Sequence, residues 1–107
     1  MKRVGFQMKV KESDIPEYRE WHRKVWPEML DALRRHGWRN YSLFMRPDGT
    51  LFGYVEVPDT FQAALDGMGK EEINTKWQDF MAPFFESVSG THADKMMEVL
   101  EPVFYLE

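Results

Sequence analysis

The chain has 107 residues, of which 43% are hydrophobic, 15% aromatic and 30% charged. This composition excludes a disordered chain and predicts a single globular domain over residues 1–107. The formal net charge of −4 argues against nucleic acid as a partner, because binding to phosphate backbones needs a concentrated basic surface. The absence of cysteine from the sequence excludes disulfides, thiolate nucleophiles and cysteine-ligated metal clusters.

We expect a cytoplasmic protein that makes no contact with a membrane. Its first residues alternate apolar with polar side chains and lack the continuous apolar segment of a signal peptide. No run in the sequence approaches the ~20 apolar residues that a transmembrane helix requires.

The first two predicted elements are a strand and a long helix. Residues 4–11 alternate apolar and polar types with the two-residue period of a strand that is buried on one face. Asp14 then stands where a capping residue would precede a helix. Apolar residues recur at three- and four-residue steps as far as Leu33, and Gly37 supplies a left-handed stop. We therefore predict one helix, bent at Pro27.

A β-hairpin is predicted next. Residues 38–46 and 51–57 are rich in aromatic and β-branched side chains, which favour strands. Between them lies Pro47-Asp48-Gly49-Thr50, a sequence typical of a turn.

The last part of the chain predicts a second helical region and a final strand. Helical spacing extends from residue 58 to Pro83, with an interruption at 67–69. A polar stretch, 87–92, follows and is predicted to be a loop. Residues 97–106 then predict a strand that Pro102 breaks.

This order of strand, helix, strand, strand, helix, strand predicts an α+β fold of the ferredoxin-like βαββαβ type, with two helices on one face of an antiparallel sheet. In the strands at 38–46 and 51–57, apolar residues occupy both odd and even positions and so lie on both faces. The sheet face without helices would therefore expose a large apolar patch. A second copy is the simplest cover. We therefore expect a homodimer in which two sheets pack face to face as a dimeric α/β barrel.

Two histidines have opposite interpretations. His22 falls on the apolar stripe of the first helix, where an isolated histidine is more often a core residue than a catalytic one. Tyr18 lies one turn earlier on the same face, however, and two polar groups on one apolar face favour a ligand. Histidine is also the side chain best suited to exchanging protons near neutral pH. His36 is explained by its place at a helix end, where a cation stabilises the dipole.

Other kinds of site have no motif in the sequence. His92 lies in the predicted loop without an obvious partner. No histidine pair has the spacing of a metal site, and Glu71-Glu72 is interpreted as part of a solvated helix face. Phosphate-binding glycine loops and the G-x-S-x-G elbow of serine hydrolases are also absent from the sequence. We therefore expect no metal.

Aromatic residues suggest a carbohydrate ligand without requiring one. Tyr41 and Trp77 can each be explained as core residues, because an aromatic side chain on a strand or helix more often packs in the core than contacts a ligand. Aromatic faces with a few hydrogen-bonding tips nevertheless suit a sugar ring, whose C–H faces stack while its hydroxyls find polar partners.

Two parts of the sequence resemble the L-rhamnose mutarotase family. The block Tyr18-Arg19-Glu20-Trp21-His22 is followed by Trp26-Pro27-Glu28, which gives the pattern Y-x-x-x-H-x-x-x-W-P-E. Asn40-Tyr41 and the ending Val103-Phe104-Tyr105-Leu106 extend the resemblance over nearly the whole chain. Members of this family interconvert the α and β anomers of L-rhamnose.

The resemblance implies a cofactor-free homodimeric isomerase of the aldose 1-epimerase type. It gives His22 the role of proton donor and places Tyr18 and Tyr41 against the sugar. Trp77-Gln78 stands where many members carry a tryptophan pair that borders the substrate. Gln78 departs from that pattern and leaves the preferred deoxy-sugar open, because an amide hydrogen-bonds a hydroxyl where an indole would stack. Arg23-Lys24-Val25 is a second departure, at positions where the family often has asparagine and proline.

Mutarotation requires protonation of the ring oxygen, removal of the anomeric hydroxyl proton and rotation of the aldehyde. We expect His22 to deliver the proton to the ring oxygen; the base could be water, a tyrosine or a carboxylate. Two alternatives stay open at this stage. A heme-degrading or cofactor-free monooxygenase of the same barrel type predicts a Soret band if heme is bound, and a non-catalytic binding module predicts that His22→Asn leaves function untouched.

Overall fold

The computed structural model describes residues 1–85 and 97–107, so the predicted loop at 87–92, with His92, lies outside the described residues. Four antiparallel strands form one sheet in the order β2-β3-β1-β4. The strands are β1 (Lys2–Lys9), β2 (Arg39–Met45), β3 (Thr50–Val57) and β4 (Glu98–Leu100). The helices are α1 (Ile15–His22), α2 (Pro27–Arg35), α3 (Phe61–Gly69) and α4 (Glu72–Met81), with 3-10 turns at Glu12–Asp14 and Ala82–Phe84.

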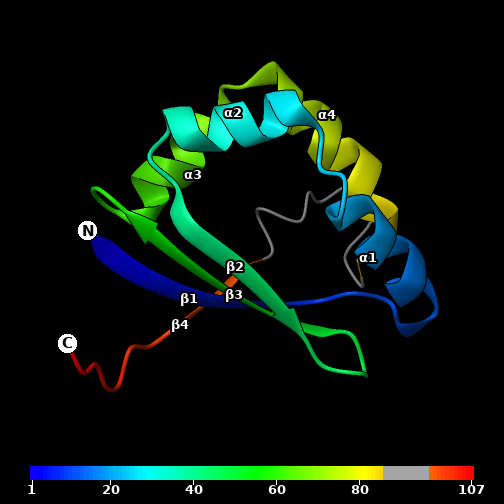
Figure 1. Cartoon of the computed structure of the whole chain (residues 1–107), viewed down its shortest axis with the longest axis horizontal. Coiled ribbons are helices and arrows are strands. Elements are labelled where there is room, and N and C mark those ends of the chain that lie inside the picture. Colours follow the sequence, from blue (N-terminus) through cyan, green and yellow to red (C-terminus); the bar gives the residue numbers. More distant parts are fainter. Residues whose placement is uncertain (86–96) are drawn as a thin grey trace.

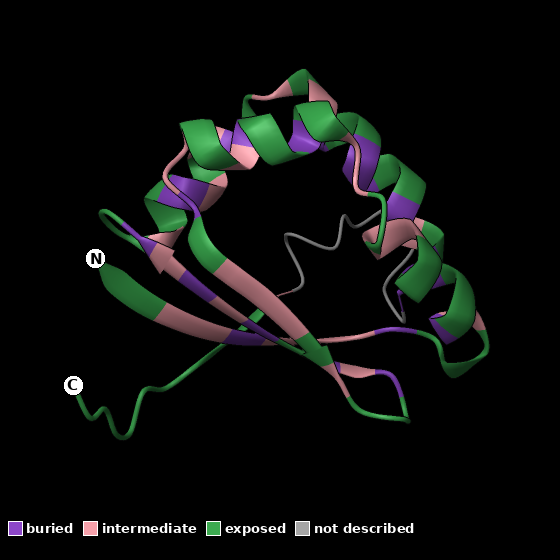
Figure 2. Ribbon diagram, in the orientation of Figure 1, coloured by how far each residue is buried: buried purple, intermediate pink, exposed green. Residues whose placement is uncertain are grey.

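The helices lie together on one face of the sheet and arch over it (Figure 1). Their buried residues face the sheet, while their outer sides are exposed (Figure 2). The predicted α+β fold, with helices gathered on one side of an antiparallel sheet, is confirmed. None of the described helices is both long enough and apolar enough to cross a membrane.

The predicted continuous first helix is wrong: the chain forms two helices, and the segment 23–26 separates them. Trp26 has an extended backbone, with φ −55° and ψ 132°. The residue before a proline is disfavoured in the α-helical region, and Pro27 is tolerated as the first residue of a new helix because its missing N–H has no intrahelical partner there. Pro27 therefore starts α2 instead of bending one long helix.

The predicted helix signals are partly confirmed. Asp14 precedes α1 but makes no side-chain capping hydrogen bond, because the chain enters α1 through the 3-10 turn that ends at Asp14. Gly37 has φ 80° and ends α2 as predicted. The second helical region is interrupted, but later than predicted: residues 67–69 are the end of α3 (Phe61–Gly69), and the break lies at 70–71, before α4 begins at Glu72.

The hairpin is confirmed, and Gly49 is necessary for its turn. Arg46 N donates a hydrogen bond of 2.8 Å to the Thr50 carbonyl oxygen. Gly49 has φ 94°, and a Cβ added there would lie 2.2 Å from the carbonyl oxygen of Val10. Any side chain at this position would be both strained and in collision.

The last strand is much shorter than predicted. It covers only Glu98–Leu100, and residues 103–106 have no regular structure and are exposed. Pro102 has no N–H to donate to a ladder, and among the described strands β4 pairs with β1 alone. The apolar ending is therefore largely exposed in a single copy, with the Arg3 guanidinium lying over the Tyr105 ring at 3.3 Å.

On the sheet side, the core is built around Phe6 of β1, which is fully buried. Its ring stacks on Phe61 of α3, with ring centroids 5.7 Å apart, and lies 6.2 Å from the ring of Tyr41. Gly53 faces Phe6 across the β1–β3 pair, and a Cβ there would lie 2.1 Å from the phenyl ring. The missing side chain at Gly53 makes room for this ring.

Candidate active site

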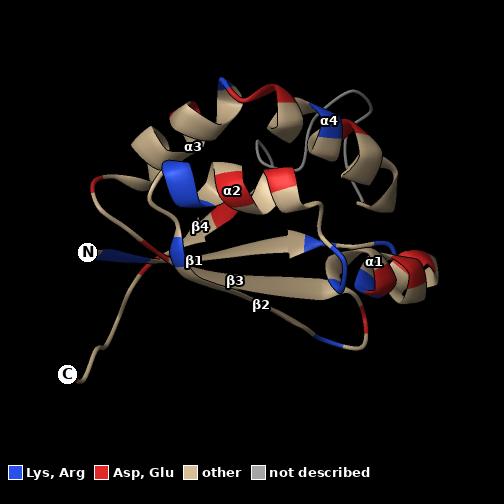
Figure 3. Cartoon of the chain, turned by 45° about the horizontal axis from the view of Figure 1, so that its top comes forward, with Lys and Arg blue, Asp and Glu red and all other residues tan. Residues whose placement is uncertain are grey.

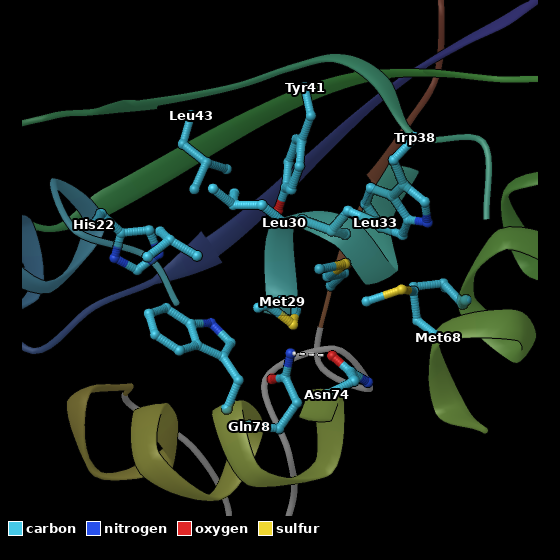
Figure 4. A pocket seen from close by; sticks show the side chains of 14 residues that line it. His22, Met29, Leu30, Leu33, Trp38, Tyr41, Leu43, Met68, Asn74 and Gln78 are labelled. Carbon is cyan, nitrogen blue, oxygen red and sulfur yellow. Dashed lines mark hydrogen bonds between the residues drawn. The ribbon is translucent and has the colours of Figure 1, made fainter. Parts of the chain in front are cut away.

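A cavity of about 370 Å³ lies between the helical arch and the sheet. In Figure 4, His22 lies at one end of it and Trp38 and Met68 at the other, while Tyr41 points into it from β2. The described residues that line it are His22, Val25, Met29, Leu30, Leu33, Trp38, Tyr41, Leu43, Leu65, Met68, Asn74, Trp77, Gln78 and Met97. The lining is mainly apolar, with a few polar tips, which is typical of a small-molecule site.

His22 is the last residue of α1 and lines the cavity as a half-buried side chain. Its Nδ1 lies 3.0 Å from the carbonyl oxygen of Tyr18. A carbonyl can only accept, so Nδ1 carries the hydrogen and the lone pair of the neutral ring is on Nε2. Burial lowers the pKa of His22, and the hydrogen bond to the Tyr18 carbonyl opposes this only in part. At neutral pH the ring is therefore uncharged, with a proton-accepting Nε2.

Tyr18 lies directly against His22. The two rings stack with centroids 4.1 Å apart, and only 3% of Tyr18 is exposed. Tyr18 is not among the residues that line the main cavity; it lines an adjoining hollow of about 430 Å³, to which His22 also contributes. Burial raises the pKa of the Tyr18 hydroxyl well above its usual range. The Tyr18 ring thus packs against the imidazole, and the Tyr18 hydroxyl keeps its proton at neutral pH.

The other predicted site residues line the main cavity. Trp77 is 6% exposed and meets His22 edge-to-face, with centroids 5.6 Å apart. Trp26 packs edge-to-face on Trp77 at 4.9 Å and fixes the plane of its indole. Burial raises the pKa of Tyr41, so its hydroxyl also stays protonated.

Gln78 and Asn74 bring two amides into this apolar lining. Both are buried, and Gln78 Nε2 donates a hydrogen bond of 3.2 Å to Asn74 Oδ1 (Figure 4). Among the described residues lining the cavity there is no acidic side chain. Nor do three or more His, Cys, Asp or Glu side chains lie together as a potential metal site anywhere in residues 1–85 and 97–107.

Comparison with known proteins gives the same family as the sequence motifs. Residues 3–106 match the family model described as L-rhamnose mutarotase. The chain belongs to the L-rhamnose mutarotase family. An L-rhamnose mutarotase of Listeria monocytogenes serovar 1/2a is 39% identical over 107 residues, covering 99% of each chain. One of Bacillus subtilis is 34% identical over 108 residues and is covered completely.

A solved structure supports this assignment. The crystal structure of an L-rhamnose mutarotase from Formosa agariphila matches with a TM-score of 0.82, 31% identity and full coverage of both chains. A Mycobacterium tuberculosis protein, Rv0793, matches with a TM-score of 0.55 and 18% identity, which shows a shared fold only. The family assignment, and with it the predicted isomerase class, is confirmed.

For this mutarotase-family chain, the structure brings four of the five predicted site residues to one cavity: His22, Tyr41, Trp77 and Gln78. Tyr18 is adjacent, with its ring stacked on that of His22. Sequence reasoning missed Asn74 and the apolar residues of α2 and α3 that complete the lining. Asn74 precedes Gln78 by one helical turn, so the helical period that placed Trp77 on the inner face of α4 could have identified it.

The interpretation of Glu71 as part of a solvated helix face is wrong. Its carboxylate accepts hydrogen bonds of 3.3 and 2.8 Å from Nε and Nη2 of Arg35, and Nε2 of His36 lies 2.8 Å from Oε2. These contacts lower the pKa of Glu71 to about 2. Glu72, by contrast, is exposed and 3.6 Å from Lys76. His36 and Glu71 therefore tie the end of α2 to the start of α4.

Proposed function

We propose that residues 1–107 act as one mutarotase domain, which interconverts the α and β anomers of L-rhamnose by acid–base-assisted opening of the sugar ring. The observation that carries the proposal is the state of His22 in a chain of this family. Its Nδ1 is engaged by a backbone carbonyl, which leaves Nε2 as the proton-accepting atom of a cavity-lining imidazole. The cavity of about 370 Å³ has room for one monosaccharide.

The proposed reaction needs one proton to move from the anomeric oxygen to the ring oxygen. Nε2 of neutral His22 takes the proton of the anomeric hydroxyl, and the electron pair of that O–H bond becomes the second bond of the aldehyde. The bond from the anomeric carbon to the ring oxygen breaks, and its electrons go to the ring oxygen, which receives the proton from the imidazolium. Rotation about the bond from the anomeric carbon to C2, followed by the reverse steps, gives the other anomer.

The electrostatics of the site support His22 as both acceptor and donor of this proton. Tyr18 and Tyr41 are held protonated by burial, so neither supplies a phenolate base at neutral pH. No described acidic side chain lines the cavity. The proton that His22 receives also stays close to the sugar, because a buried imidazolium is destabilised and returns its proton readily.

The remaining predicted contacts have separate roles in this proposal. Trp77 and Tyr41 provide the aromatic surface and a hydroxyl donor inside the cavity, and Gln78 hydrogen-bonds a sugar hydroxyl. Tyr18 orients His22 through stacking and contacts the sugar where the adjoining hollow meets His22.

Saturation-transfer NMR of the exchange between the two anomers tests this function. The wild type is expected to accelerate exchange of L-rhamnose, with L-fucose as the comparison sugar. If the protein accelerates exchange for none of the aldoses tested, the proposal is overturned.

We also propose that the protein is a cytoplasmic homodimer that does not bind nucleic acid. Phe44 and Phe52 are cross-strand neighbours on the sheet face opposite the helices, and they are 66% and 36% exposed. Charged side chains gather on the helices and strand ends, while the middle of the sheet carries few (Figure 3). A second copy placed on this face would cover the phenyl rings and the apolar ending at 103–106.

Equilibrium sedimentation tests the dimer. The wild type is expected at twice the chain mass of 12.8 kDa, and Phe44→Asp is expected to shift it towards one chain by placing a charge in the interface. Lys70→Glu, on the exposed helical side, is the matched control and is expected to leave the mass unchanged. A monomeric wild type would contradict the dimer.

A further inference from the structure

Asn74 and Gln78 form a hydrogen-bonded amide pair on α4, in the lining of the cavity. They are 4% and 9% exposed and are the buried polar side chains within residues 1–85 and 97–107. Both line the cavity, one helical turn apart, next to apolar residues such as Met29 and Met68. Burying an amide in apolar surroundings is unfavourable unless its hydrogen-bonding groups find partners. The question is therefore which partners the Gln78 amide finds.

The hydrogen bonds of Gln78 are only partly satisfied by the protein. Its amide offers two N–H donors and a carbonyl oxygen that can accept two bonds. In the described structure, one N–H is used by Asn74 Oδ1, at 3.2 Å. That bond fixes which side of the amide group faces Asn74. It leaves the Gln78 carbonyl oxygen turned away from Asn74 in the cavity wall (Figure 4). A hydroxyl of a ligand in the cavity would supply the missing donor.

We propose that the Gln78 carbonyl oxygen accepts a hydrogen bond from one ring hydroxyl of the sugar, other than the anomeric one. Asn74 is the positioning residue that orients this carbonyl oxygen towards the hydroxyl. This inference rests on the proposed function, since it takes a pyranose as the occupant of the cavity. It makes the amide pair the determinant of which sugars bind, separate from the proton transfer at His22. A site built to pair a hydroxyl discriminates against an analogue that lacks it, because its own polar group is then left unpartnered.

The test compares variants and sugars together. Gln78→Met has nearly the shape of glutamine without its hydrogen-bonding groups, and it is assayed with L-rhamnose and its 2-deoxy, 3-deoxy and 4-deoxy analogues. With L-rhamnose, the KM is expected to rise about tenfold to a hundredfold with little change in kcat. With the one analogue that lacks the hydroxyl in question, wild type and variant are expected to have the same KM. Gln78→Leu serves in its place if circular dichroism shows Gln78→Met to be unfolded.

Asn74→Leu tests the positioning role. The variant is expected to show a smaller rise in KM with the same dependence on the sugar, because the glutamine is present but no longer held. Met68→Leu, a cavity-lining residue on α3, is the matched control, and any loss that it causes is expected to be uniform over the four sugars.

Two results would overturn the inference with an active wild type. If Gln78→Met raises KM by the same factor for all four sugars, Gln78 does not recognise a particular hydroxyl. If Asn74→Leu raises KM by the same factor for all four sugars, Asn74 does not position Gln78. A wild type that binds sugars without accelerating exchange would overturn the proposed function alone, and the same comparisons made on Kd by calorimetry would then decide the inference. A wild type that binds none of these sugars would overturn both.

Discussion

His22 and His36 both lie at the end of a helix, and their surroundings differ in what they leave unsatisfied. His36 follows α2 and pairs with a carboxylate, since its Nε2 lies 2.8 Å from Glu71. His22 ends α1 and has a backbone carbonyl as the hydrogen-bond partner of its Nδ1, while Nε2 has none among the described residues. The difference teaches that a histidine is a candidate for proton transfer when the fold satisfies one nitrogen and turns the other towards a cavity.

The largest expected effect is the loss of the His22 imidazole, and the loss of the His36 imidazole is its control. His22→Asn is expected to lower kcat for anomer exchange by about 10²–10⁴-fold, the usual contribution of a positioned acid–base group. His36→Asn is expected to leave kcat within a small factor of the wild type. Saturation-transfer NMR measures both, and circular dichroism confirms that each variant is folded. Equal activity of wild type and His22→Asn would contradict the mechanism.

The pH dependence of the reaction should report the buried histidine. Because burial lowers the pKa of His22 below 6.5, the neutral form dominates at pH 7 and above. The enzymatic part of kcat/KM is therefore expected to be flat from neutral to mildly alkaline pH. Below the lowered pKa it should fall about tenfold for each pH unit, as one proton binds. A rate that instead rises on acidification would show that the imidazolium is the form that binds the sugar productively.

The smallest effect is expected at Glu71, and on stability instead of activity. Its pKa of about 2 in the folded protein is below the ordinary value of 4.5, so the unfolded chain binds a proton more readily. The contribution to stability is complete above pH 4.5 and is lost as the pH falls towards 2. Glu71→Gln is expected to lower Tm at neutral pH and to flatten the fall of Tm over that acidic range. An unchanged Tm profile by differential scanning calorimetry would contradict this role.

Local signals predicted the fold well where one residue decided the backbone. Gly49 and Gly37 were expected at a turn and at a helix end, and both have positive φ. The helix break before Pro27 was missed because the apolar spacing continues through it, and spacing does not report the backbone of the residue before a proline. The last strand was predicted too long because the apolar residues at 103–106 have the composition of a strand but pair with none of the described strands.

For the candidate site, the residues themselves identified His22 and Tyr18 as neighbours, which their stacked rings confirm. The resemblance to the family was needed to choose Tyr41, Trp77 and Gln78 among many aromatic and polar residues. The contact of Glu71 with Arg35 and His36 was not predictable from the sequence. It joins residues about 35 positions apart, and only the tertiary arrangement of α2 and α4 brings them together.

The arch of four short helices has a consequence for how the cavity can change. Its walls carry full-sized side chains, among them Met29, Leu33 and Trp38, so the empty space is produced by the path of the backbone and not by truncated residues. A void made by shortening core side chains costs stability in proportion to its volume. Here the length of the segment between α1 and α2, or between α3 and α4, could enlarge or narrow the chamber while leaving the packed layers intact. Engineering for a larger or smaller ligand would therefore begin at these two breaks.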